Sequence, residues 1–251
     1  MYPYIFTPLE KLETFKISVA LGVLLMVLTL YYSIEKKDRA EESAYIFPRL
    51  VVGSIIGFGF AIIFDSFFKF LEHGVLKIYG MAFYGGLLGA SAVVYVILRM
   101  SKEKTGYSIS FWFNKMTVPF MLFHVLGRIG CFLGGCCYGK VSDSIFAVAF
   151  PDIPEAGIIH AGTKCYPTQL FEAFAVLLLI FLVFASKRRY VTYLFSYSIV
   201  RFSLEFLRGD DRGSNFLLLS PSQLVALSII AVIVIREILI ENRKKGKEIR
   251  V

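Results

Sequence analysis

Charged residues are scarce in this chain. Only 18% of its 251 residues are charged, whereas 57% are hydrophobic. An average soluble domain has about 25% charged and about 45–50% apolar residues. Short alternating segments, which are typical of transmembrane β-barrels, are also missing. These absences exclude an ordinary soluble domain and favour an α-helical membrane protein, because the apolar residues come in long blocks.

The cysteines form no CxxC pair, so their spacing is a poor match to a zinc or thioredoxin motif. There are four of them: Cys131, Cys136, Cys137 and Cys165. Three uses stay open: small buried apolar side chains, a disulfide from Cys136 or Cys137 to Cys165, or a metal or redox site that adds His124 to the first three. Cys131 and Cys136 share no helical face unless the helix unwinds at Gly134 and Gly135.

The formal net charge of +8 is typical of proteins that bind nucleic acids. The Lys and Arg residues, however, lie in short groups between the apolar blocks. This distribution is typical of membrane topology signals, so we expect no nucleic-acid partner.

Seven apolar blocks are visible, at 17–34, 46–70, 79–98, 116–136, 167–185, 190–207 and 220–240. Most approach the ~20 residues that one helical crossing needs. No cleavage site follows the first block, so we expect a retained helix. We therefore predict an all-α integral membrane protein with one domain over 1–251 and about seven transmembrane helices. The polar stretch 138–165 is predicted to be an extramembrane arm, 241–251 a basic tail, and 108–113 (SISFWF) an interfacial segment.

Positive charge is distributed unequally between the two sets of loops. The loops after the first, third, fifth and seventh blocks hold about twice as many Lys and Arg residues as the N-terminal segment and the other loops. Cytoplasmic loops carry such an excess. The N-terminus is therefore predicted to be outside and the C-terminus cytoplasmic.

Stretch 124–139 (HVLGRIGCFLGGCCYG) places an arginine and a histidine inside the fourth block. A charge at the centre of a membrane helix costs roughly 2.5–3.5 kcal/mol, so each needs a reason. Arg49 is near the inner end of its block and can extend to the cytoplasmic surface. Arg128 and Arg201 cannot, and both fall in the outer half of their helices.

Other polar residues lie at the same predicted depth. They are Asp65, Gln169, Glu172 and Glu205. Arg201 and Glu205 have the spacing of a helical ion pair, and Tyr197 lies on the same face. His124 and Arg128 share a face of the fourth block. Separate structural ion pairs would explain one such pair; charges from four helices at one depth favour a hydrated cavity instead.

The chemistry of that cavity follows from its arginines. A planar guanidinium binds a phosphate through two hydrogen bonds. A phosphate site at this depth indicates a phospholipid headgroup. Tyr84, in MAFYGGLLG, is either an interfacial aromatic residue or a donor to the phosphate, and Gly85 and Gly86 permit close approach to the backbone.

Four motifs in this order resemble the bacterial prolipoprotein diacylglyceryl transferases: FYGGLLG, GRIGCFLGGCCYG, YPTQLFE and RFSLEFLRGDDR. The resemblance implies that Arg128 is the essential arginine of the family signature. It also implies that Tyr197, Arg201 and Glu205 form the family's YxxxRxxxE helix. Gln169 and Glu172 fall in the segment that corresponds to PSQLYE.

The sequence departs from the family pattern at three positions. Tyr84 stands where the family has the histidine of an HGG motif, and Cys131 and Cys136 stand where its signature has Asn and Glu. His124, one turn before Arg128, is the candidate to supply an imidazole.

The resemblance implies an enzyme that transfers the diacylglyceryl group of phosphatidylglycerol to the lipobox cysteine of a prolipoprotein signal peptide. It implies a site on the outer side of the bacterial cytoplasmic (inner) membrane. We predict Arg128, Arg201, Glu205, Tyr84 and His124 as catalytic residues. The predicted substrate-binding residues are Arg128, Tyr197, Gln169, Glu172, Gly85, Gly86, Cys131 and Cys136. No cofactor or metal is expected. The alternatives are a lipid-headgroup transferase with another acceptor, or a non-enzymatic redox or metal-binding membrane protein built on the cysteines.

Overall fold

The computed structural model describes residues 4–6, 11–33, 39–74, 83–105, 107–151, 162–209 and 219–248. The predicted arm 138–165 is therefore covered except for 152–161, and the last three residues of the predicted tail lie outside the described residues.

The described part of the chain contains seven helices and two small sheets. The helices are α1 (Thr14–Ser33), α2 (Arg39–His73), α3 (Phe83–Thr105), α4 (Ile109–Leu133), α5 (Thr168–Ala185), α6 (Arg189–Glu205) and α7 (Pro221–Glu248). The strands are β1 (Tyr4–Phe6), β2 (Lys11–Glu13), β3 (Val148–Ala149) and β4 (Lys164–Cys165), paired antiparallel as β1–β2 and β3–β4.

Six of these helices, all except α6, are long and apolar enough to cross a membrane. The prediction of a mostly helical membrane protein is confirmed. Helix α6 has only 17 residues, so the count of seven crossings stays a prediction.

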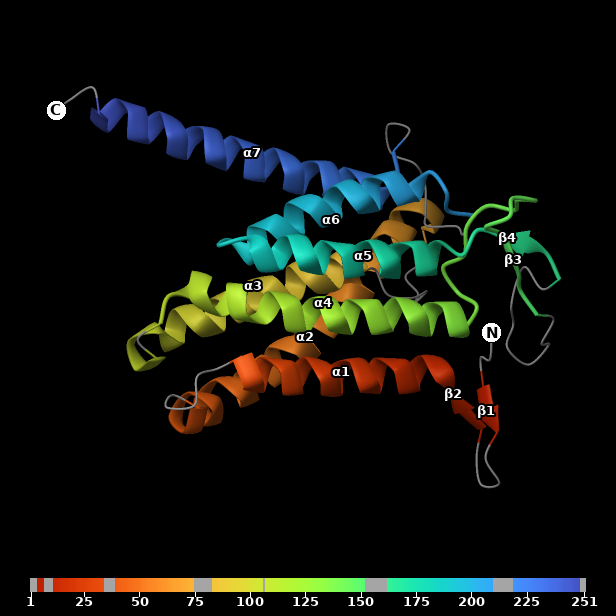
Figure 1. Ribbon diagram of the computed structural model, residues 1–251, viewed down its shortest axis with the longest axis horizontal. Helices are drawn as coiled ribbons and strands as arrows, with labels where there is room; N and C mark the ends of the chain where they lie inside the picture. The colour runs from red at the N-terminus through yellow and green to blue at the C-terminus, as the bar shows by residue number, and fades with distance from the viewer. Residues whose placement is uncertain are drawn as a thin grey trace.

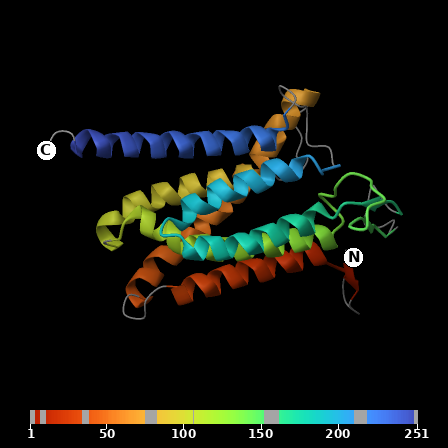
Figure 2. The ribbon, with the colours of Figure 1, turned by 45° about the horizontal axis from the view of Figure 1, so that its top comes forward.

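The helices run roughly side by side, with α4 in the middle of the bundle (Figures 1 and 2). Helix α4 contacts α1, α3, α5 and α6, while α2 packs mainly on α3 and α7 mainly on α6. The β1–β2 hairpin and the β3–β4 arm lie at one end, and the C-terminal end of α7 lies at the other (Figure 1).

Helix α4 begins earlier than predicted. Ser108 caps it by accepting a hydrogen bond from the backbone N–H of Phe111 at 3.2 Å. Trp112, inside the segment predicted to lie along the interface, is fully buried against Val94 and Leu98 of α3. Residues 109–113, predicted as part of an interfacial segment, are thus the first turn of α4, because an N-cap and a buried aromatic residue favour continuing the helix. Their position at the interface stays a prediction.

Helix α7 starts at a reciprocal capping box. The backbone N–H of Ser220 donates to Gln223 Oε1 at 3.0 Å, and the N–H of Gln223 donates to Ser220 Oγ at 3.2 Å. Pro221 occupies the first helical position, where its missing N–H costs nothing. The sequence SPSQ thus fixes the position of Ser222, which faces α6.

Helices α2 and α3 pack at close range. A Cβ added to Gly85 would collide with the Phe64 side chain and lie 3.0 Å from the Phe60 carbonyl oxygen. A Cβ added to Gly86 would lie 3.2 Å from Ala61 Cβ. The close approach that these two glycines permit is therefore that of helix α2.

The arm is tied to the bundle by backbone hydrogen bonds. The N–H of Gly139 donates to Tyr166 O and that of Lys140 to Leu207 O, both at 2.8 Å. Cys165, in β4, is fully buried with Tyr138 and Phe150. Burial raises the pKa of its thiol, and its sulfur is free. Of the three uses considered, this cysteine has that of a small buried apolar side chain.

Candidate functional site

Glu172, in the second turn of α5, joins three helices through one oxygen. Its Oε1 lies 2.9 Å from Arg128 Nη2 of α4 and accepts a hydrogen bond from the Tyr197 hydroxyl of α6 at 2.5 Å. His124 Nε2, also on α4, is 3.4 Å away. All four side chains are buried. Their charges and hydrogen bonds compensate each other where little water can reach.

The His124 ring contacts neighbouring side chains through both of its nitrogens and one of its faces. Its Nδ1 lies 3.0 Å from the Tyr193 hydroxyl, and Arg128 Nε donates toward its Nε2 at 3.4 Å. Its ring stacks on Phe83 with centroids 4.2 Å apart, and the Arg128 guanidinium lies 5.5 Å from the same Phe83 ring. Both ring nitrogens therefore have partners within the protein, and the imidazole supports the position of Arg128.

Arg201 is the second buried cation. Its Nη2 lies 2.6 Å from Glu205 Oε2 and donates to Ser222 Oγ of α7 at 3.1 Å. The predicted ion pair one turn apart on α6 is confirmed. Arg201 is 1% exposed, so its charge is compensated within the bundle.

Buried polar atoms with unused hydrogen-bonding capacity gather around these two pairs. Within the described part of the chain, those on the site helices α3, α5 and α6 include Tyr84 Oη, Gln169 Oε1, Glu172 Oε2, Ser198 Oγ and Arg201 Nη1. Buried polar atoms usually have partners, and a set without them requires an explanation. Tyr84, Ser198 and Arg201 lie near one another, so their donors and acceptors are suited to a polar ligand.

Both guanidiniums act on one carboxylate. Glu172 bonds Arg128 directly, and Arg201 lies near enough to interact with it electrostatically. Tyr84 lies near Ser198 and interacts electrostatically with the charges of Arg201 and Glu205. Two arginines with two carboxylates make the cluster neutral overall, and the arginine donors that remain can bind an anion.

The end of α4 brings three cysteines together. Gly135 has φ +74°, its N–H donates to Phe132 O at 3.2 Å, and the N–H of Cys136 donates to Cys131 O at 3.1 Å. These are the two hydrogen bonds of a Schellman motif. The sulfurs of Cys131, Cys136 and Cys137, here called the thiol cluster, lie within 4.8 Å of one another, and no disulfide joins them.

Helix α5 holds this turn in place. Gln169 Nε2 donates to Cys136 O at 2.5 Å, and Thr168 Oγ1 donates to Cys137 O at 2.9 Å. Gln169 is therefore close to the site, but its amide nitrogen supports the thiol cluster.

The structure thus brings together most residues predicted for the site. His124, Arg128, Glu172 and Tyr197 form one network, and Arg201 and Glu205 form the neighbouring pair. Gly85 and Gly86 face α2 instead of these side chains. His124 does not belong to the group of possible metal ligands, which contains only cysteines in the described residues.

Sequence reasoning missed three residues: Phe83, Tyr193 and Ser222. Tyr193 lies one turn before Tyr197, so extending that helical face would have found it. Ser222 follows from the capping box, which orients the first turn of α7. For Phe83 no signal separates it from the other apolar residues of its block.

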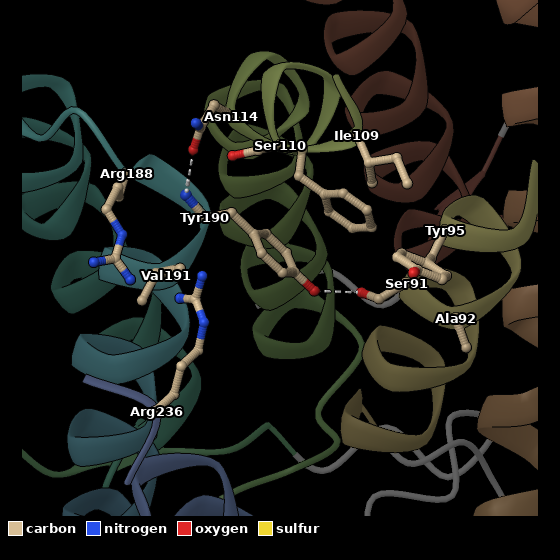
Figure 3. A pocket seen from close by; sticks show the side chains of 11 residues that line it. Ser91, Ala92, Tyr95, Ile109, Ser110, Asn114, Arg188, Tyr190, Val191 and Arg236 are labelled. Atoms are coloured by element: carbon tan, nitrogen blue, oxygen red, sulfur yellow. Dashed lines mark hydrogen bonds between the residues drawn. The ribbon is translucent and has the colours of Figure 1, made fainter. Parts of the chain in front are cut away.

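A separate pocket of about 430 Å³ is lined by residues of α3, of the first turns of α4 and α6, and of α7 (Figure 3). There the Tyr190 hydroxyl donates to Ser91 Oγ at 2.6 Å, and the N–H of Tyr190 donates to Asn114 Oδ1 at 3.1 Å. Arg188 and Arg236 approach it from the side (Figure 3). No residue predicted for the site lines this pocket. Its polar contacts tie the start of α6 to α3 and α4.

A bundle of apolar helices that buries two Arg–Glu pairs defines a class: a helical membrane protein with a polar site between its helices. The chain belongs to the prolipoprotein diacylglyceryl transferase family, because the model of that family matches residues 3–239.

Individual relatives agree with this assignment. A protein of Clostridium tetani named phosphatidylglycerol–prolipoprotein diacylglyceryl transferase is 30% identical over 233 residues, covering 88% of this chain and 90% of the relative. Relatives with the same name are 37% identical over 166 residues in Solidesulfovibrio magneticus (60% of this chain, 58% of the relative) and 27% identical over 250 residues in Dehalococcoides mccartyi (92% and 90%).

Proposed function

We propose that this chain transfers the diacylglyceryl group of phosphatidylglycerol to the lipobox cysteine thiol of prolipoproteins. The observation that carries the proposal is the buried Arg128–Glu172–Tyr197 network beside Arg201, in a chain that the family model matches nearly from end to end. The network provides anion-binding groups in the bundle, where a phospholipid headgroup can enter sideways.

The two arginines bind the lipid phosphate. The acceptor thiolate attacks the glyceryl carbon that carries the phosphate ester, the C–O bond breaks, and glycerol phosphate leaves. Negative charge grows on the departing oxygen, and fixed cations stabilise it more strongly in the transition state than in the ground state. Arg201 Nη1 and the Tyr84 hydroxyl, which have no hydrogen-bond partner among the described residues, donate to the phosphate.

The acceptor must lose its thiol proton, since the thiolate is the nucleophile. Glu172 Oε2 and Glu205 are the carboxylates of the site, and His124 is its imidazole. Because both His124 nitrogens already have partners, we assign His124 to positioning Arg128. The proton goes to a carboxylate of the site or to water.

We further propose that α6 crosses the membrane with the other six helices, with the N-terminus outside and the C-terminus in the cytoplasm. An odd number of crossings agrees with the hairpin and the arm at one end of the bundle and the end of α7 at the other (Figure 1). The site is then in the outer half of the bacterial inner membrane. The glycines Gly85 and Gly86 act by allowing α3, which carries Tyr84, to pack on α2.

The test is formation of a thioether on a lipobox peptide from labelled phosphatidylglycerol by the purified chain. We expect transfer by the wild type and a loss of about 10²-fold or more in Arg128→Ala, because an anion-stabilising donor is removed. A peptide with serine in place of the lipobox cysteine should accept nothing. No transfer by folded wild-type protein contradicts the proposal. Transfer of the headgroup to another acceptor would favour the related headgroup transferase.

A further inference from the structure

The thiol cluster is a feature that phosphate binding does not use. Cys131 is in the last turn of α4, Cys136 and Cys137 follow its end, and the three sulfurs lie within 4.8 Å of one another. In a Schellman motif the residue after the left-handed glycine packs on the residue five positions earlier. Here both of these positions are cysteines, so the turn itself brings two thiols together.

The turn is rigid enough to keep them there. Its two backbone hydrogen bonds fix Cys131 relative to Cys136, and Cys137 has φ +63°, an uncommon value for a side-chain-bearing residue. Gln169 and Thr168 hold the carbonyl groups of Cys136 and Cys137 from α5. These contacts preorganise the three sulfurs, and the Cys136 thiol, which donates to Cys131 O at 3.6 Å, loses its proton when a cation binds.

We propose that Cys131, Cys136 and Cys137 bind one thiophilic d¹⁰ cation, Zn²⁺ or Cu⁺. Zinc–sulfur bonds of about 2.3 Å place the sulfurs of one site roughly 4 Å apart. The present separations of up to 4.8 Å differ from this by an amount that side-chain rotation supplies. Soft thiolates select such cations over hard ones.

The surroundings fit the charge and the access that such a site needs. Three thiolates with Zn²⁺ carry one net negative charge, and the Arg128 guanidinium, which is paired with Glu172, lies near Cys131 and Cys137. Cys136 is exposed, so a cation can enter, whereas the other two are half-buried. The fourth cysteine, Cys165, lies in the arm with Tyr138 and Phe150.

A site with three protein ligands keeps a fourth coordination position open. Catalytic zinc sites use that position for water or substrate. This step rests on the proposed function: the acceptor there is a thiol, which would bind the cation as a thiolate and lose its proton to solvent. The cation then presents the sulfur nucleophile beside Arg128. Metal coordination activates thiol nucleophiles in this way.

The first experiment measures binding without activity. The full chain, purified in detergent under reducing, anaerobic conditions, is titrated separately with Zn²⁺ and Cu⁺ and analysed for bound metal. We expect one equivalent in the wild type, loss of stoichiometric binding in Cys136→Ser and Cys137→Ser, and retention in the control Cys165→Ala. The titration, with Zn²⁺ or with Cu⁺, that gives the tighter binding identifies the cation. Cys136→Ser keeps the backbone bonds of the turn, and an unchanged unfolding temperature verifies its fold.

The second experiment uses Co²⁺ as a spectroscopic probe. Addition of a lipobox peptide should change the thiolate-to-cobalt absorption of the wild type, whereas the serine-substituted peptide should not. No metal binding, equal binding in Cys136→Ser, or a disulfide within the cluster would overturn the metal site. If the peptide leaves the cobalt spectrum unchanged, the metal site stands, but the proposal that its cation binds the acceptor thiol is overturned. Both readouts are independent of transfer, so failure of the proposed function is distinguishable from failure of the site.

Discussion

The hydroxyl of Tyr197 donates to Oε1 of Glu172 at 2.5 Å, the oxygen that also binds Arg128. Oε2 of the same carboxylate has no hydrogen-bond partner among the described residues. One oxygen of Glu172 thus holds α4 and α6 to α5, while the other is available to a ligand. The charge of Glu172 is what allows the Arg128 guanidinium to be buried at this point.

Glu172→Gln tests that role. Glutamine keeps the shape and an acceptor oxygen but leaves the buried guanidinium without a countercharge. We expect a loss of about 3 kcal/mol in the free energy of unfolding in detergent, and a loss of transfer because Arg128 is no longer held.

Glu237→Gln is the matched control. It removes a carboxylate that bonds Arg188 through both oxygens, but on the exposed surface of the bundle. Exposed ion pairs contribute about 1 kcal/mol or less. Equal destabilisation by the two substitutions would contradict a special role for the buried carboxylate.

The sequence was sufficient to predict contacts between residues of the same helix. Apolar block length predicted the helices, and a spacing of four predicted the Arg201–Glu205 pair, which the structure places at 2.6 Å. The Arg128–Glu172 pair was not predictable as a pair, because it depends on how α4 and α5 pack. Depth alone placed both residues in one region without assigning partners.

Local turn chemistry accounts for the rest. The cysteines were expected to diverge if the helix continued, and Gly135 decides between the alternatives by adopting a left-handed conformation. Likewise, glycines in α3 signalled close approach, but only the packing of α2 shows what approaches. The backbone conformation of such glycines is therefore easier to predict from the sequence than the residues that pack against them.

Tyr84→Phe should separate binding from stability. The Tyr84 hydroxyl is buried beside Ser198 and makes no hydrogen bond of good geometry to the described residues, so removing it costs the folded protein little. We expect an unchanged or slightly higher unfolding temperature together with a loss of transfer of about 10-fold, since the donor to the phosphate is gone. Both are measured on the same preparation.

Tyr197→Phe gives the opposite pattern for comparison. Its hydroxyl is bonded to Glu172, so we expect a loss of about 1 kcal/mol of stability in addition to any effect on transfer. If Tyr84→Phe destabilises as much as Tyr197→Phe while transfer is retained, Tyr84 is a structural residue.

Gly85→Ala should disturb the packing of α3 on α2. The added methyl group collides with the Phe64 side chain and crowds the Phe60 carbonyl. Overpacking of this kind costs about 1–3 kcal/mol. It should also displace the neighbouring Tyr84, so transfer falls with the unfolding temperature.

Gly127→Ala is the corresponding control on α4. An added Cβ meets no atom of the described residues within 4 Å, although Gly127 precedes Arg128. Alanine in a helix is favoured over glycine by about 1 kcal/mol. We expect stability to be unchanged or raised; a loss equal to that of Gly85→Ala would show that crowding against α2 is not the cause.

Arg201→Lys tests whether the planar guanidinium matters. Nη2 of Arg201 bonds Glu205 and Ser222, while Nη1 has no hydrogen-bond partner among the described residues. The three donors of a lysine ammonium sit on one nitrogen, so lysine cannot reproduce the planar fork whose Nη2 bonds two partners while Nη1 faces the phosphate. We expect transfer to fall by about 10²-fold, as when one transition-state donor is removed.

Ser222→Ala, which only loosens Arg201, should lower transfer about 5-fold. Ser203→Ala removes an exposed hydroxyl that bonds Ile199 O on the same helix and should change nothing. Steady-state kinetics with phosphatidylglycerol measure all three variants. Wild-type rates in Arg201→Lys would refute a role for the planar guanidinium, because a positive charge alone would then be sufficient.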